Sequence, residues 1–206
     1  MDGLLFTSVL TELVSAVISF AIGYYAYKGY KASSARGLFL LHLGFLILGV
    51  SLLLRFVTFS YLAMLRLSEP RIQAFRAVIS LGGMVLTSLQ LIAYTLFAAS
   101  YTSKPIEENE KMLAVLPGFY IIFFNPFLEL IALAIIGYVA ARALINFLYK
   151  ATGNSLLVLL GFTCFFISHL FFLFTIFSEM LLFLGQIIKL LGFISLLIML
   201  TRVTRG

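Results

Sequence analysis

Residues 37–54 decide the fold class, and they read GLFLLHLGFLILGVSLLL. This stretch contains no Asp, Glu, Lys or Arg. An uncharged apolar run of this length crosses the hydrocarbon core of a bilayer, about 30 Å thick, as one α-helix. We therefore expect a transmembrane helix here and ask whether the rest of the chain is built in the same way.

The composition of the whole chain agrees with this expectation. Of its 206 residues, 63% are hydrophobic and 11% are charged, whereas soluble domains are roughly half apolar and a quarter charged. The net charge of +6 comes mostly from Lys and Arg at the ends of apolar runs, where such residues set membrane topology. We therefore predict a multi-pass integral membrane protein in a lipid bilayer and no nucleic-acid partner.

Six apolar runs are long enough to cross a membrane, and they predict an all-α bundle of six transmembrane helices. The runs lie near residues 3–27, 36–64, 75–101, 119–149, 155–178 and 180–203. A polar loop over residues 102–118 divides this single transmembrane domain, 1–206, into repeat 1 (about 3–101) and repeat 2 (about 119–203). A seventh crossing within residues 106–125 is the alternative.

The two halves resemble each other when they are aligned without gaps. At an offset of 117, Glu12 matches Glu129, and Leu-Gly-Phe at 43–45 matches Leu-Gly-Phe at 160–162. Internal repeats are common in membrane folds, and three helices per repeat would turn the second half upside down. We therefore expect an inverted repeat. An even number of crossings puts both termini on one side, and a small excess of Lys and Arg there favours the cytoplasm.

Two charged residues in the first half are expected to pair inside the membrane. At 1.5 Å per residue, Glu12 and Arg55 lie about 13 and 12 Å from the side of the N-terminus. Buried charges are costly alone, so an interhelical ion pair between them is the simplest arrangement.

A larger set of polar residues falls at similar depths, about 8–16 Å from the opposite side. It consists of His42, Gln90, Tyr94, Glu129, His169 and Lys189. The most economical pair within it joins Glu129 to Lys189, as the counterpart of Glu12 with Arg55. Such an intramembrane cluster either stabilises the bundle or carries protons or ions.

His42 and His169 also allow a cofactor to be considered. A b-type haem held between two helices needs two imidazoles at nearly equal depth, and the six-helix topology puts these two within about 4 Å of the same level. No cytochrome motif accompanies them, so haem b remains an alternative, with these histidines as axial ligands, and no cofactor is predicted outright.

The chain contains no motif that indicates catalysis. The sequence has no His-Glu-x-x-His, no phosphate-binding Gly-rich loop and no Gly-x-Ser-x-Gly, so an enzyme is not the favoured class. We expect a non-catalytic subunit packed against other membrane subunits, as in a respiratory or other energy-converting assembly. The alternatives are a small proton-coupled or ion/solute transporter using Glu129, His169 and Lys189, and the haem electron carrier.

Overall fold

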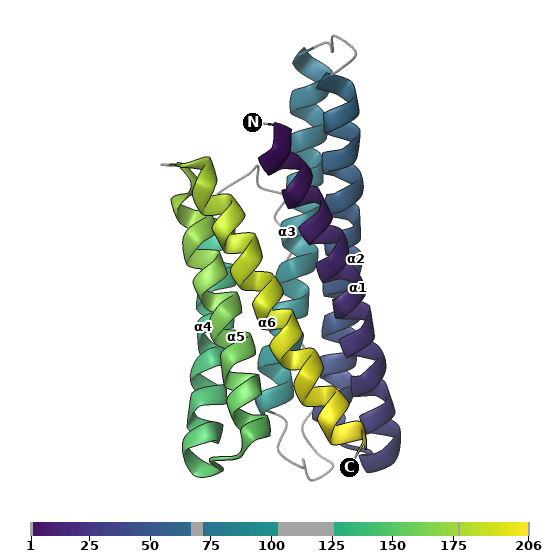
Figure 1. The fold of residues 1–206 in the computed structure, drawn as a ribbon, viewed down its shortest axis with the longest axis vertical. Helices are drawn as coiled ribbons and strands as arrows, with labels where there is room; N and C mark the ends of the chain where they lie inside the picture. The colour runs from purple at the N-terminus through teal and green to yellow at the C-terminus, as the bar shows by residue number, and fades with distance from the viewer. Residues whose placement is uncertain (1, 67–71, 103–125, 177, 206) are drawn as a thin grey trace, which may run out of the picture.

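The computed structural model describes residues 2–66, 72–102, 126–176 and 178–205, and all the secondary structure in these ranges is helical. The helices are α1 (Asp2–Ser33), α2 (Arg36–Arg66), α3 (Ile72–Thr102), α4 (Pro126–Tyr149), α5 (Gly153–Leu173), the short 3-10 helix η1 (Phe174–Ile176) and α6 (Glu179–Arg205). Each α-helix contains a span long and apolar enough to cross a membrane. The predicted all-α six-helix membrane bundle is confirmed (Figure 1).

Two of the turns between helices are held by local hydrogen bonds. At the end of α1, Ser34 adopts a positive φ of 54°, and its N–H donates to the Tyr30 carbonyl at 2.7 Å, which satisfies one of the last free carbonyls. Before α5, the Thr152 hydroxyl accepts from the Ser155 N–H, and the Ser155 hydroxyl accepts from the Thr152 N–H. This capping box fixes the start of α5.

The six α-helices form a closed ring in which each one packs against the next in the chain and α6 packs against α1. Within each half, consecutive helices run in opposite directions, but α3 and α4 run in the same direction (Figure 1). A hydrogen bond agrees with this, because Arg142, late in α4, donates to the carbonyl of Tyr101 at the end of α3 (3.4 Å). Residues 103–125, including the polar loop and the possible seventh crossing, lie outside the described residues.

The parallel course of α3 and α4 corrects two predictions. The halves α1–α3 and α4–α6 share one orientation, so the expected inverted arrangement does not fit. The two ends of the chain also lie toward opposite ends of the bundle (Figure 1), so the prediction that both termini face the cytoplasm does not fit either.

Equivalent glycines pack the second helix of each half against the third. A Cβ on Gly44 would lie 2.5 Å from the Phe97 ring and 3.2 Å from the Ala93 carbonyl. A Cβ on Gly161 would lie 2.5 Å from Leu196 and 3.2 Å from the Gly192 carbonyl. The two glycines, on the second helix of each half, are 117 residues apart, as in the sequence alignment. Their contact residues on the third helices, Ala93 with Gly192 and Phe97 with Leu196, are 99 residues apart.

Aromatic side chains fill the space where the two halves meet. The rings of Phe97 and Phe162 lie 5.7 Å apart, and those of Phe45 and Phe193 lie 6.5 Å apart, both edge to face. All four side chains are at most 2% exposed. This apolar layer lies between the buried polar residues around Arg55 and His169 and the end of the bundle where α2 and α5 begin.

Candidate functional site

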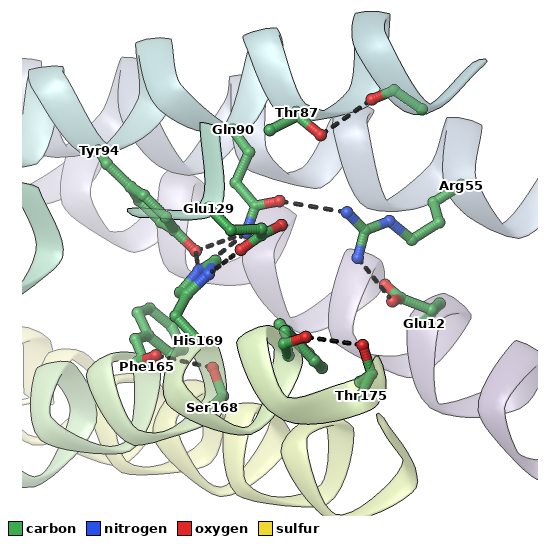
Figure 2. A network of polar contacts seen from close by, with 12 residues as sticks. Glu12, Arg55, Thr87, Gln90, Tyr94, Glu129, Phe165, Ser168, His169 and Thr175 are labelled. Atoms are coloured by element: carbon green, nitrogen blue, oxygen red, sulfur yellow. Dashed lines mark hydrogen bonds and ion pairs between the residues drawn. The ribbon is translucent and has the colours of Figure 1, made fainter. Parts of the chain in front are cut away.

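Six polar side chains from five helices form one hydrogen-bonded chain inside the bundle (Figure 2). We call it the polar network: Glu12 (α1), Arg55 (α2), Gln90 and Tyr94 (α3), Glu129 (α4) and His169 (α5). The structure therefore joins the two groups of residues that the sequence placed at separate depths. The reason is the orientation of the second half, which carries Glu129 and His169 to the level of Glu12.

At one end of the network, Arg55 lies between a carboxylate and an amide. Its Nη1 donates to Glu12 Oε1 at 3.3 Å, and its Nη2 donates to Gln90 Oε1 at 3.2 Å. The Glu12 side chain is 2% exposed and the Arg55 side chain 17%. A guanidinium can only donate, so the oxygen of the Gln90 amide faces Arg55 and its nitrogen points away.

The orientation of Gln90 sets the direction of the next bonds. Its Nε2 must donate, and it lies 2.7 Å from the Tyr94 hydroxyl and 3.1 Å from Nε2 of His169. The Tyr94 hydroxyl, which accepts from Gln90, lies 2.7 Å from the same His169 nitrogen. Nε2 of His169 therefore faces two donors, and it must accept.

The other nitrogen of His169 faces an acid. Its Nδ1 lies 2.8 Å from Glu129 Oε2. With Nε2 accepting, the ring is a neutral imidazole that carries its proton on Nδ1 and donates to the carboxylate. The His169 side chain is fully buried, whereas that of Glu129 is 21% exposed. The site thus holds an acid and a base in contact, with the acid reaching the surface of the bundle.

The pairs in the two halves are related but chemically different. In each half a carboxylate on the first helix, Glu12 or Glu129, pairs with a base on the second helix, and the two carboxylates match at the offset of 117. The base is Arg55 in one half and His169 in the other. An arginine stays protonated in proteins, whereas a histidine changes charge near neutral pH. The base of the second pair can therefore change its charge, whereas the base of the first pair keeps its charge.

Lys189 does not pair with Glu129, which binds His169 instead. Its Nζ has no hydrogen-bond partner among the described residues and lies 5.8 Å from the centre of the Phe172 ring. Lys189 is nonetheless 2% exposed. Lys189 lies ten residues into α6, as Glu12 lies ten residues into α1, and these two helices pack together, so Lys189 belongs to the same region of the bundle.

His42 lies apart from the network. Its Nδ1 is 2.8 Å from the Gly23 carbonyl, and its ring packs against Tyr27 and Phe39. His42 is six residues into α2 and His169 sixteen into α5, two helices of the same direction, so their depths differ by about 15 Å. The two imidazoles are not brought together, and both nitrogens of His169 are already engaged, so the haem arrangement does not fit.

Sequence reasoning missed Gln186, which is 4% exposed and whose Oε1 is unpaired among the described residues. Its only signal was a polar residue one turn from Lys189 in an apolar helix. In the described part of the chain, no group of three His, Cys, Asp or Glu side chains could hold a metal ion.

Comparison of the chain with protein-family models, with curated proteins and with solved structures finds no match. The function must therefore be argued from the geometry of the polar network.

Proposed function

We propose that this protein is a proton-coupled transporter in which Glu129 and His169 bind and release the proton. The observation that carries the proposal is the continuous hydrogen-bonded chain from Glu129 to Glu12, which joins the Glu129–His169 pair to the Glu12–Arg55 ion pair across both halves. Ionisable groups inside a membrane are costly and typically mark proton or ion pathways.

The position of Glu129 gives protons a route to the pair. Glu129 lies in the first turn of α4, and its side chain is 21% exposed. A proton can reach this carboxylate from the end of the bundle where α1 and α4 begin. His169, behind it, is fully buried, so the proton passes no further without a change in the network.

Proton binding to His169 would rearrange the bonds that join the halves. An imidazolium donates from both nitrogens, so Nε2 could no longer accept from Tyr94 and Gln90. Tyr94 would have to turn its O–H away, and the Gln90 amide, held by Arg55, would have to move. A proton taken up in the second half would thereby change the contacts of the first half. Such coupling between two halves is what alternating access requires.

Paired histidine variants test the proposal. The protein is reconstituted in vesicles loaded with a pH-sensitive dye, a potassium diffusion potential is imposed, and proton uptake is followed with and without a mixture of amino acids, sugars and organic acids. Wild-type vesicles should acidify, and Glu129→Gln and His169→Gln should abolish the signal. His42→Gln is the matched control, because His42 also bonds through Nδ1 but lies outside the network. Equal loss in all three variants, or no wild-type signal, would contradict the proposal.

A second candidate is the non-catalytic subunit of a larger membrane assembly. The observation that favours it is the outer face of α4. Among the described helices α4 packs against α3 and α5 alone, and its outer face exposes Ile131, Tyr138 and Ile145 at intervals of seven residues. Lipid or a helix of another subunit can cover this stripe. Gentle solubilisation from native membranes tests it: a subunit should co-purify with fixed partners, whereas a solitary protein would exclude this role.

A further inference from the structure

Three buried polar atoms lack hydrogen-bond partners among the described residues: Glu12 Oε2, Gln186 Oε1 and Lys189 Nζ. Their residues are 2%, 4% and 2% exposed. A buried polar group without a partner destabilises the folded protein, and a charged group does so more strongly. Three such atoms in one bundle therefore indicate that something else completes their bonds.

The three atoms belong to one region. Gln186 and Lys189 are three residues apart on α6, so their side chains leave the same face of the helix. α6 packs against α1, and the two helices run in the same direction (Figure 1). Glu12 lies ten residues from the start of α1, and Lys189 lies ten residues from the start of α6, so the two residues lie at similar depth. We call these three residues the α6 polar site.

The chemistry of the three atoms selects the ligand. The ammonium of Lys189 can only donate, whereas the oxygens of Glu12 and Gln186 accept. A ligand that satisfies all three must accept one hydrogen bond and donate two. A metal cation would be repelled by the ammonium of Lys189. An anion would be repelled by the carboxylate of Glu12 and by the amide oxygen of Gln186. Water accepts and donates as required, and buried waters typically make about three hydrogen bonds.

We propose that the α6 polar site binds one water molecule, which bridges Lys189, Gln186 and Glu12. The water extends the polar network from Glu12 to α6, so all six helices then contribute to one hydrogen-bonded chain. It also explains how Lys189 is held in the bundle although Glu129 is engaged by His169.

The bridging water also provides a proton path, and this part of the inference rests on the proposed transport function. The ammonium of Lys189 gives a proton to the water oxygen as the water gives one of its own protons to Glu12 Oε2. The products are a neutral amine, a neutral carboxylic acid and the same water. The charged or titratable groups on the other helices around Lys189 are Glu12 on α1, Arg55 on α2, Glu129 on α4 and His169 on α5.

A structure at a resolution that reveals single waters tests the site directly. The full chain is crystallised from a lipid mesophase as wild type, as Gln186→Leu and as Ser195→Ala. We expect one isolated density peak within about 3.2 Å of the three atoms. The peak should be lost in Gln186→Leu and kept in Ser195→Ala, a control on α6 whose hydroxyl donates to Leu157 at 2.8 Å. A direct bond between Lys189 and Glu12 without a peak, or a lipid or ion in the site, would overturn the proposal.

The proton path has its own readout, which separates its failure from failure of the transport proposal. In the dye-loaded vesicles, Lys189→Met and Gln186→Leu should slow proton uptake about 100-fold, the lower range for loss of a positioned proton-transfer group. Wild-type rates in both variants would overturn the path but not the water site. Loss of uptake in Glu129→Gln with normal uptake in Lys189→Met would support transport and reject the path.

Discussion

Glu12→Gln tests whether the first ion pair holds the network together. The glutamine keeps an oxygen that can accept from Arg55 but loses the negative charge. Removing one partner of a buried ion pair costs about 3–5 kcal/mol. Arg55 is 17% exposed and keeps its bond to Gln90, so we expect the lower limit, about 3 kcal/mol. For a chain of this length this corresponds to a fall in melting temperature of about 6–12 °C.

The double variant Glu12→Gln/Arg55→Gln should recover much of this loss, because no uncompensated charge remains. We expect the double variant to be less destabilised than the sum of the two single variants by about 2 kcal/mol, within the range for residues in contact. The single cysteine of the chain, Cys164, is partly buried, so its reaction with a fluorescent maleimide during heating reports unfolding.

The control for this cycle pairs Arg55→Gln with Ser19→Ala. Ser19 also links α1 to α2, since its hydroxyl donates to the Phe45 carbonyl at 2.8 Å, whereas Arg55 donates to Glu12 and Gln90. These two changes should add to within about 0.5 kcal/mol. If the Glu12 and Arg55 changes are equally additive, the ion pair does not stabilise the protein and the reasoning fails.

Two further predictions concern the histidine and the glycines. Nitrogen NMR of histidine-labelled protein should show the His169 proton on Nδ1, and Gln90→Leu should shift its Nε2 signal; a proton on Nε2 in the wild type would contradict the direction of the network. Gly161→Ala and Gly44→Ala should each lower stability by about 1–3 kcal/mol, because the added Cβ would lie 2.5 Å from a side chain on the next helix and 3.2 Å from its backbone. Gly153→Ala, with nothing within 4 Å, should leave the melting temperature unchanged, and equal losses in all three would show that helix packing is not the cause.

The membrane class and the helices could be predicted because hydropathy is a local property. The uncharged apolar run at residues 37–54 is enough to specify one span, and the lengths of the other apolar runs specify the remaining five. Polar residues such as Glu129 and His169 could also be singled out, since a polar residue within an apolar stretch is evident from the sequence before its partners are known.

The mutual position of the two halves could not be predicted in this way. A single additional or missing crossing reverses the direction of every helix that follows it. The depths of Glu129 and His169 relative to each other survive this reversal, because both residues move together. Their depth relative to the first half does change with the reversal. The sequence therefore places His169 at the level of His42, whereas in the structure His169 lies at the level of Glu12 and Arg55.

The sequence by itself determined that this chain forms apolar helices and which buried positions carry charge, because both depend on short stretches of residues and on the bilayer as solvent. Only the tertiary structure decided that His169 rather than Lys189 faces Glu129, and that Gln90 joins the pair to Arg55. These contacts require helix rotation and direction to be set to within a hydrogen-bond length. That information resides in the packing of the ring of helices, at positions such as Gly44 and Gly161, and in no single segment.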